Sequence, residues 1–334
     1  MGKRFTGMLA LAIVLMTGLI YLALEDAKTQ QSQLGRLVFP ELKANLEQIA
    51  EIHISAGAQS VILEKLEGGW RLRNRSGYPV DRLQLARLLR ALAEMVYLEE
   101  KTRNPERFAE LGLGDSDGQQ GAATGIELLA PNQRWALLVG AKPSGREGQY
   151  IRLPELSSTW LIDQTLALPQ DPVKWLAPLI MNVDSARVRQ VILNQPEGSR
   201  VVIDNRSAVQ DGIESATITN LPVGASLIYS GVADEVTRAL VNLRLQDVQA
   251  AENIDWQGAI VAQYELVDGK TLWIKGVVVD GESWISVALV PAFSQQERSA
   301  YDLSNDVENW AFKISQYDYQ VLSRGLKDFV DSES

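Results

Sequence analysis

The stretch YPVDRLQLARLLRALAEM, residues 78–95, decides the fold, because the hydrophobic period changes within it. Upstream of this stretch, apolar and polar residues alternate, which is the pattern of a strand with one buried face. Within it, apolar residues recur at helical spacing: Leu85, Leu88, Leu89, Leu92 and Met95. Asp81, with Gln84 three residues later, matches the capping-box pattern of a helix start. The stretch therefore predicts a strand followed by an amphipathic helix.

Strand patterns lie on both sides of this predicted helix. Alternating residues precede it at Ile49, Ile52, Ile54, Val61 and Leu63, and a short helical stretch, Glu41–Leu46, comes before them. Further strands are expected at Ile126–Leu129, Trp135–Val139, Tyr150–Leu153 and Thr159–Ile162. We therefore predict one α+β unit over residues 47–180.

Residues 181–334 repeat this order of strands, one helix and more strands. Strands are expected at Val191–Leu193, Val201–Ile203, Ile260–Val267, Thr271–Val279 and Trp284–Leu289, and a final helix at Asp318–Val330. The helix between them is indicated by Val232, Val236, Leu240 and Leu243. The predicted fold class is α+β, with two duplicated sheet-plus-helix units of mostly antiparallel strands.

The N-terminus has the pattern of a membrane anchor. Lys3 and Arg4 precede the uncharged apolar run Phe5–Leu24, and Glu25 follows it. Twenty residues at about 1.5 Å each span roughly 30 Å, the thickness of the hydrocarbon core of a bilayer. The charges predict a single transmembrane helix within residues 1–26, with a cytoplasmic N-terminus. Residues 27–46 would be a membrane-proximal spacer and short helix, and the bulk of the chain would lie in a bacterial periplasm.

A cleaved secretory signal is the alternative to this inner-membrane anchor. Such a signal has an apolar core of about 7–15 residues and small residues at the cleavage site. The run Phe5–Leu24 is longer, and Leu22–Ala27 offers no clear site of that kind. We therefore expect the anchor to be retained.

Composition limits the possible partners. The chain has 334 residues, of which 46% are hydrophobic, and this is enough for a substantial core. Its formal net charge of −10 disfavours binding to nucleic acid, whose phosphates require a basic surface. The sequence contains no cysteine, which excludes disulfides and lipid attachment at cysteine.

No catalytic, cofactor-binding or metal-binding residue is predicted. The single histidine, His53, alternates with Ile52 and Ile54, which favours a structural role on the opposite strand face. Asp115–Gly118 resembles only the start of a calcium loop, and Gly112–Gly114 lacks the residues of a phosphate-binding loop. Asp163 and Asp171 are among several carboxylates that the sequence alone cannot pair.

Ordered short motifs across about 130 residues resemble the bacterial domain of unknown function 4340 family. The motifs are Ile49-x-x-Ile52-x-Ile54, Gly69-Trp70-Arg71-Leu72, Tyr78-Pro79-Val80-Asp81, Thr102-x-Asn104-Pro105-x-x-Phe108, Leu111-Gly112-Leu113, Val139-Gly140, Tyr150-Ile151-Arg152, Trp160-Leu161-Ile162-Asp163 and Trp175-Leu176. The resemblance implies a membrane-anchored protein associated with ABC transporter subunits similar to those of gliding motility. It implies no catalytic residue, and the second unit departs from the motif string.

These observations lead to one principal functional hypothesis. We expect a non-enzymatic accessory subunit of an ABC-type transport system, with the permease and auxiliary membrane subunits as partners and Phe5–Leu24 in the membrane. The subunit would act by binding proteins or envelope substrates. A membrane-tethered periplasmic hydrolase that uses carboxylates is one alternative, and an envelope scaffold or ligand sensor is another.

Overall fold

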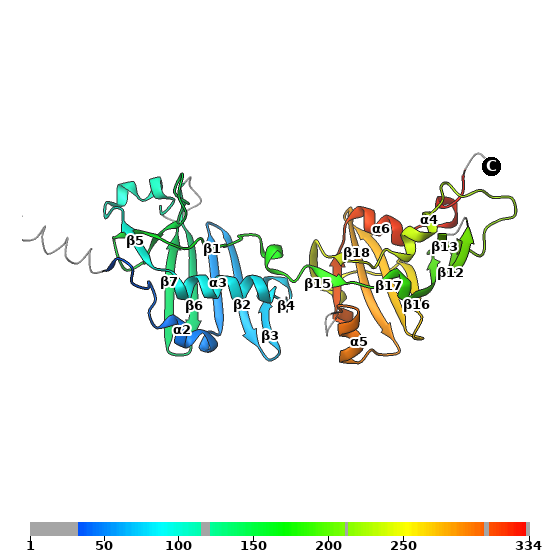
Figure 1. Ribbon diagram of the computed structural model, residues 1–334, viewed down its shortest axis with the longest axis horizontal. Helices are drawn as coiled ribbons and strands as arrows, with labels where there is room; N and C mark the ends of the chain where they lie inside the picture. Colours follow the sequence, from blue (N-terminus) through cyan, green and yellow to red (C-terminus); the bar gives the residue numbers. More distant parts are fainter. Residues whose placement is uncertain (1–32, 115–120, 211–212, 304–306, 332–334) are drawn as a thin grey trace, which may run out of the picture. The chain divides into compact units, whose positions relative to one another are not determined.

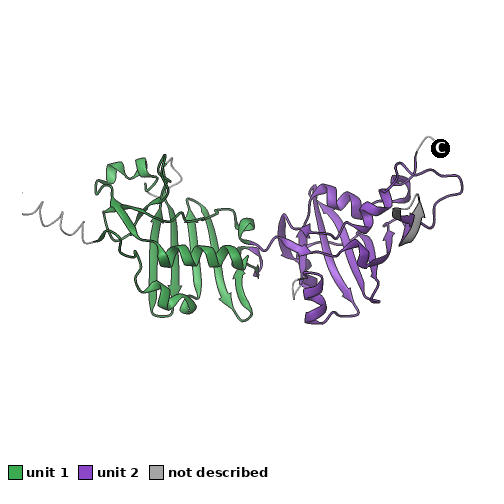
Figure 2. Ribbon diagram, in the orientation of Figure 1, with its two compact units in different colours: residues 1–74, 79–175 green, residues 75–78, 176–334 purple. Residues whose placement is uncertain are grey.

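The computed structural model describes residues 33–114, 121–210, 213–303 and 307–331 (Figure 1). The chain divides into two compact units, which Figure 2 colours separately. Unit 1 holds the chain up to Asn74 together with Pro79–Trp175, and unit 2 holds Arg75–Tyr78 together with the chain from Leu176 onward. No pattern in the sequence indicates that Arg75–Tyr78 belongs with the second unit.

Unit 1 is built on a nine-stranded sheet with the order β4-β3-β2-β1-β6-β7-β8-β9-β5. Its strands are β1 (Glu51–Ala56), β2 (Gln59–Leu66), β3 (Gly69–Leu72), β4 (Tyr78–Pro79), β5 (Tyr97–Glu100), β6 (Thr124–Ala130), β7 (Gln133–Val139), β8 (Gln149–Arg152) and β9 (Thr159–Ile162). Its helices are α2 (Leu42–Asn45) and α3 (Arg82–Glu94), with 3₁₀ turns η1 (Leu46–Gln48), η2 (Arg73–Arg75), η3 (Pro105–Arg107), η4 (Ala109–Leu111) and η5 (Pro172–Trp175). The pairings from β3 through to β5 are antiparallel.

Helix α3 forms where the sequence predicts it and lies across one face of this sheet (Figure 1). The carboxylate of Asp81 accepts hydrogen bonds from the N–H groups of Leu83, at 2.9 Å, and Gln84, at 3.1 Å. The reciprocal half of the capping box is absent, because the backbone N–H of Asp81 donates to the carbonyl of Trp175 at 2.8 Å and not to the side chain of Gln84. Leu85, Leu88 and Leu92 are buried, so the apolar stripe faces the core.

Unit 2 contains an eight-stranded antiparallel sheet with the order β13-β12-β11-β16-β17-β18-β19-β15. Its strands are β11 (Val188–Asn194), β12 (Arg200–Gln210), β13 (Ile213–Ile218), β15 (Asp247–Ala250), β16 (Ile260–Leu266), β17 (Thr271–Val279), β18 (Glu282–Val290) and β19 (Trp310–Lys313). A separate pair joins β10 (Leu179–Met181) to β14 (Leu243–Arg244). The helices are α4 (Val232–Thr237), α5 (Gln295–Ala300) and α6 (Gln316–Leu322), with 3₁₀ turns η6 (Ser185–Arg187), η7 (Ala251–Asn253), η8 (Val307–Asn309) and η9 (Leu326–Asp328).

The sheet of unit 2 repeats the strand order of unit 1. The order β3-β2-β1-β6-β7-β8-β9-β5 of the first sheet matches the order β13-β12-β11-β16-β17-β18-β19-β15 of the second. Strands at the same place in the two sheets also come in the same order along the chain. Ile52 of β1 lies between Leu63 and Leu128 on the neighbouring strands. Val191 of β11 takes the same place between Ile203 and Tyr264. All six side chains are buried, so the matching positions point into the core of each unit.

Two helices of unit 2 differ from their predicted lengths. Helix α4 ends at Thr237, so Leu240 and Leu243 are buried outside it. The predicted helix Asp318–Val330 is also wrong, because α6 ends at Leu322 and only the short turn η9 follows. The side-chain amide of Gln195 donates to the carbonyl oxygens of Ser323 and Arg324, at 2.9 and 3.0 Å. Contacts from a distant strand end thus satisfy the carbonyl groups at which the helix stops.

The structure corrects the predicted membrane topology. Among residues 33–114, 121–210, 213–303 and 307–331, no helix is long and apolar enough to cross a membrane. The longest helix of these segments, α3, has 13 residues, whereas about 20 are needed to span a bilayer. The predicted anchor Phe5–Leu24 lies outside the described residues. The single-pass topology, the inner-membrane localisation and the transmembrane part of the predicted fold class are therefore withdrawn, and the described fold consists of α+β units with mostly antiparallel sheets.

Candidate functional site

His53 takes part in a partly buried ion pair of unit 1. Its Nε2 atom lies 2.7 Å from Oε2 of Glu51, and Glu51 also pairs with Arg73 at 3.0 Å. The hydrogen bonds from His53 and Arg73 lower the pKa of Glu51. Both neighbours of His53, Ile52 and Ile54, are buried on the opposite strand face. His53 therefore lies in a surface charge network, with no serine or threonine hydroxyl among its described partners.

The carboxylates of Asp163 and Asp171 bind backbone N–H groups. Asp163 accepts a hydrogen bond from the N–H of Val96 at 2.8 Å, and Asp171 accepts one from Val173 at 3.0 Å. Such contacts hold a strand end and a 3₁₀ turn in place. The described contacts thus give each of these carboxylates a structural role.

The glycines at 112 and 114 are required for packing. Gly112 has φ +68°, and a Cβ atom there would lie 2.7 Å from the backbone nitrogen of Ala141. At Gly114 a Cβ atom would lie 3.0 Å from the carbonyl oxygen of Gly121. The Asp115–Gly118 motif lies outside the described residues. In the part of the chain that the structure describes, no group of three or more His, Asp or Glu residues could hold a metal ion.

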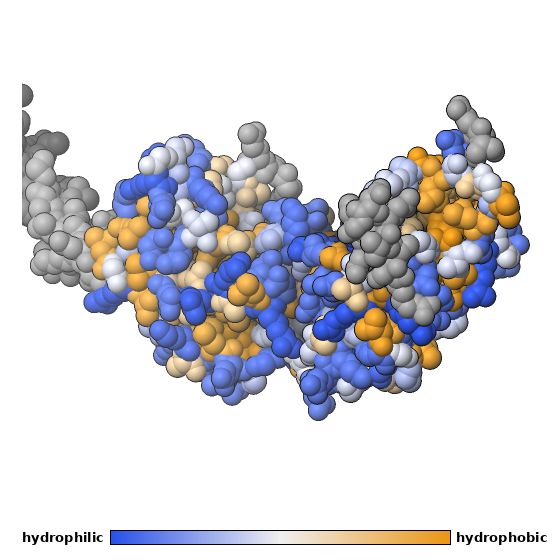
Figure 3. Space-filling view, turned by 45° about the vertical axis from the view of Figure 1, so that its right-hand side comes forward, coloured by the Kyte–Doolittle hydropathy of each residue, from blue (hydrophilic) through white to orange (hydrophobic). Residues whose placement is uncertain are grey.

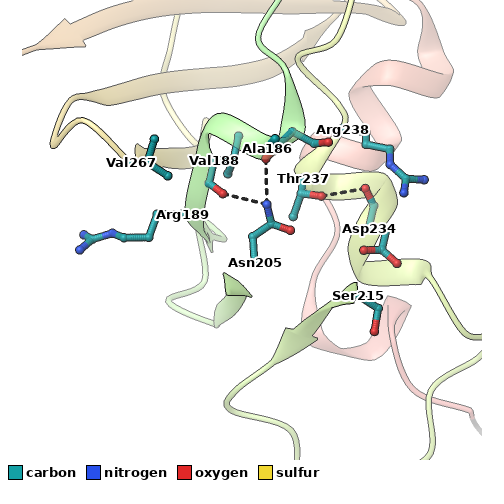
Figure 4. Close-up of a pocket in the computed structure, with 10 residues that line it drawn as sticks. Ala186, Val188, Arg189, Asn205, Ser215, Asp234, Thr237, Arg238 and Val267 are labelled. Carbon is teal, nitrogen blue, oxygen red and sulfur yellow. Dashed lines mark hydrogen bonds between the residues drawn. The ribbon is translucent and has the colours of Figure 1, made fainter. Parts of the chain in front are cut away.

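A polar groove in unit 2 is the main candidate site. It consists of two cavities of about 390 and 590 Å³, and Ser185 and Arg238 line both of them. The first cavity is also lined by Ala186, Val188, Arg189, Asn205, Ser215, Asp234, Thr237 and Val267 (Figure 4). The second is also lined by Asn182, Asp184, Arg187, Val241, Ala300 and Asp302. We call these two cavities together the groove.

The groove lies where the hairpin of β12 and β13 loses its regular register. The pairing shifts between Asp204 and Ala208, immediately beside Asn205. The side-chain amide of Asn205 donates to the carbonyl oxygens of Ser185, at 2.8 Å, and Val188, at 2.7 Å (Figure 4). These bonds hold the turn η6 against the irregular hairpin and form one wall of the groove.

Unit 1 is regular at the corresponding place. Lys65 is the position of unit 1 that corresponds to Asn205. It comes directly after Glu64, which pairs with Glu51, just as Asn205 comes directly after Asp204, which pairs with Gln190. Lys65 remains paired with Trp70 in the hairpin, and its ammonium group donates to the carbonyl of Glu47 at 2.8 Å. The register shift beside Asn205 is therefore a departure of unit 2 from the topology that the two units share.

Helix α4 supplies the other wall. The carboxylate of Asp234 accepts the N–H of Ala216 at 2.8 Å, which ties the helix to strand β13. Thr237 is buried, and its hydroxyl donates to the carbonyl of Asp234 at 3.0 Å. Arg238 follows as the C-cap residue of α4 and is exposed. Figure 4 shows Arg189 and Arg238 on opposite sides of Asn205.

A second surface of unit 2 is apolar. We call Leu221–Tyr229 the apolar segment, and within it Val223 is fully exposed, while Ile228 and Tyr229 are 43% and 42% exposed. The segment forms the loop at the right-hand end of unit 2 in Figure 1, and hydrophobic residues gather at that end of the surface in Figure 3. Three large exposed hydrophobic residues within seven positions exceed the scattered exposure that is normal for a soluble surface.

The backbone of the apolar segment is fixed at its C-terminal half. Ile228 donates its N–H to the carbonyl of Phe329 at 3.0 Å, and Asp331 donates to the carbonyl of Ser226 at 2.9 Å. An antiparallel bridge joins Leu227 to Val330 between these bonds. The side chain of Ile228 therefore projects from a backbone that hydrogen bonds hold in place.

Sequence reasoning identified neither of these surfaces. The groove joins residues from 182 to 302, and no local pattern brings them together. The apolar segment had a usable signal, because Leu221–Tyr229 contains no charged residue and has neither strand nor helix periodicity. An uncharged apolar run of that kind is a candidate for exposure at a contact surface.

Comparison with known proteins gives one match. The family described as Domain of unknown function (DUF4340) matches residues 70–272. No curated protein and no solved structure matches the chain. The match extends beyond the first unit into β17 of the second, so it covers a larger part of unit 2 than the motifs indicate. Because it spans more than half of the 334 residues, the chain belongs to the DUF4340 family.

Proposed function

We propose that this protein is a non-enzymatic binding subunit of an ABC-type transport system, and that its apolar segment, Leu221–Tyr229, contacts a partner subunit. The observation that carries the proposal is the full exposure of Val223 in a segment whose C-terminal half is held by backbone hydrogen bonds. The transport system is the association that the family resemblance implies.

The physical argument rests on the free energy of burying apolar surface. Covering a fully exposed valine side chain contributes roughly 1.5–3 kcal/mol to association. Ile228 and Tyr229 add partly exposed apolar area beside it. Because the hydrogen bonds to Phe329 and from Asp331 already order the C-terminal half of the segment, binding costs less conformational entropy than it would for a free loop. A preformed apolar surface of this kind is suited to docking against another protein.

Affinity purification of the tagged full chain from its native cells tests the proposal. A permease and an ATPase should co-purify with the wild-type protein and not with the double variant Val223→Asp, Ile228→Asp. The matched control is Val278→Asp on β17, which places a charge at another exposed valine of unit 2, 51% exposed. Recovery of the wild-type chain without a permease or ATPase, or equal recovery of both with the double variant, would overturn the proposal.

A further inference from the structure

We propose that the groove of unit 2 binds an oxyanionic group, a carboxylate or a phosphate, and that Arg238 is the residue that pairs with it. The proposal concerns a different surface from the apolar segment and does not depend on the transport partner. It rests on the charges that line the groove and on what each of them contacts.

The acidic side chains of the groove are already engaged within the protein. Asp184 accepts the N–H of Ala186 at 2.9 Å, as the cap of η6. Asp234 accepts the N–H of Ala216 at 2.8 Å, and Asp302 accepts a hydrogen bond from the side chain of Asn182 at 3.4 Å. Each carboxylate thus binds a group of the protein and keeps its negative charge, so a bound anion has to pair with an arginine of the groove.

Two of the three arginines that line the groove are engaged as well. Arg189 pairs with Glu265, and the guanidinium of Arg187 lies 4.9 Å from the centre of the Tyr301 ring. Arg238 has no hydrogen bond from its side chain, ion pair or ring contact with any residue that the structure describes. A guanidinium carries five N–H donors in a planar fork that fits carboxylate and phosphate oxygens. Arg238 is therefore the cation of the groove that is available to a ligand.

The backbone of Arg238 is held in place, and its side chain lines both cavities of the groove. The backbone N–H of Arg238 donates to the carbonyl of Asp234 at 3.1 Å, and the preceding Thr237 is buried. Ser185 lines both cavities with Arg238 and Ser215 lines one of them, so the groove also contains two hydroxyl groups that can donate hydrogen bonds. The combined cavities are large enough for a small organic anion.

Stabilisation of the C-terminus of α4 is an alternative explanation for a cation at position 238. A positive charge at a helix C-terminus is stabilising, and lysine satisfies that requirement as well as arginine does. Bidentate recognition of an oxyanion distinguishes the two residues, because lysine lacks the planar fork. The variant Arg238→Lys therefore separates ligand binding from stabilisation of the helix.

Calorimetric titration of the full chain with inorganic phosphate and, separately, with succinate tests the proposal. At least one probe should bind at a single site, and Arg238→Gln should weaken it by about tenfold or more, since a hydrogen bond to a charged group is worth about 1.4 kcal/mol or more. Arg238→Lys should weaken it severalfold while leaving the melting temperature unchanged. Arg244→Gln removes an exposed positive charge outside the groove and should bind as the wild type does.

The two titrations also identify the chemical class of the anion. Preference for phosphate over succinate assigns a phosphorylated ligand, and the reverse assigns a carboxylate ligand. Absence of binding of either probe to the wild type, or equal binding by Arg238→Gln and the wild type, overturns the proposal. Because Val223→Asp, Ile228→Asp leaves the groove intact, that variant should retain binding, and a failed docking experiment does not affect this result.

Discussion

The guanidinium of Arg324 lies 2.6 Å from the carboxylate of Glu235 and joins the residues after α6 to helix α4. Their side chains are only 16% and 33% exposed. Arg324 also donates to the carbonyl of Val232 at 3.2 Å. Although burial raises the pKa of Glu235, hydrogen bonds from Tyr229 and Arg324 lower it, and the pKa lies below its usual value. The pair thus fixes α4 from a segment that is distant in sequence.

Replacement of Glu235 by Gln should lower the free energy of unfolding by about 1 kcal/mol, because Arg324 is left partly buried without its counter-charge. Urea denaturation of the full chain measures the change. Glu110→Gln is the matched control, since Glu110 pairs with Arg107 where both side chains are 61% exposed, and it should have little effect. Equal stability of the two variants would show that the Arg324 pair contributes nothing beyond an ordinary surface pair.

Replacement of Asp81 by Ala should destabilise unit 1 by about 1 kcal/mol, because the N–H groups of Leu83 and Gln84 lose their acceptor. Asp81→Asn keeps a side-chain oxygen at the N-cap and should lie close to the wild type. Circular dichroism in a urea series gives both values. If the Ala and Asn variants had the same midpoint, the capping bonds would not be the source of the stability.

Replacement of Gly112 by Ala should cost more stability than replacement of Gly145 by Ala. Both glycines have positive φ, +68° and +76°, so both substitutions carry a backbone cost of about 1 kcal/mol. Only at Gly112 would the new Cβ meet a backbone atom, the nitrogen of Ala141 at 2.7 Å, while nothing lies within 4 Å at Gly145. Melting temperatures of the two variants give the comparison, and equal losses would contradict the close approach at Gly112.

The stability of α5 should depend on pH through Glu297. Hydrogen bonds from the backbone and side chain of Ser294, together with Lys270, lower the pKa of Glu297 from 4.5 to about 2. A depressed folded-state pKa gives stability that is present above pH 4.5 and is lost as the pH falls towards 2. The stability difference between the wild type and Glu297→Gln should therefore shrink across that range.

Thermal unfolding of both proteins at pH 7, 4, 3 and 2 measures this difference. Glu110→Gln is the reference variant, because Glu110 forms an exposed ion pair with Arg107. Its melting temperature should differ little from that of the wild type at each pH. A constant gap between wild type and Glu297→Gln from pH 7 to 2 would contradict the low pKa.

Local pattern predicts α3 and the strands whose residues alternate regularly. Thr271–Val279 is a strand with the predicted bounds, and Asp81 caps α3 as expected. These elements depend on the alternation or helical spacing of their own residues, which the sequence displays directly. Strand β19 and helix α5 were missed, because Trp310–Lys313 has three consecutive buried residues without alternation and Gln295–Ala300 has no apolar stripe.

The groove could not be predicted, because its residues lie far apart in sequence and meet through an irregular pairing. Asn205 lies beside the register shift of its hairpin, and its amide binds Ser185 twenty residues earlier. Nothing in the residues around 205 predicts that shift. Nothing in the sequence distinguishes Arg238 from other surface arginines. It is the available cation of the groove because Arg187 and Arg189 contact Tyr301 and Glu265 in the folded protein.

The sequence by itself determined many of the strands, the capped helix α3 and the repeated order of elements, because these follow from periodicity and from capping residues within a few positions. Only the tertiary structure decided where α6 ends, how short α4 is and where the groove opens. Each of these depends on side chains that bind distant backbone groups, such as Gln195 on the carbonyls of Ser323 and Arg324. Local propensity is worth only tenths of a kcal/mol per residue, so such contacts override it.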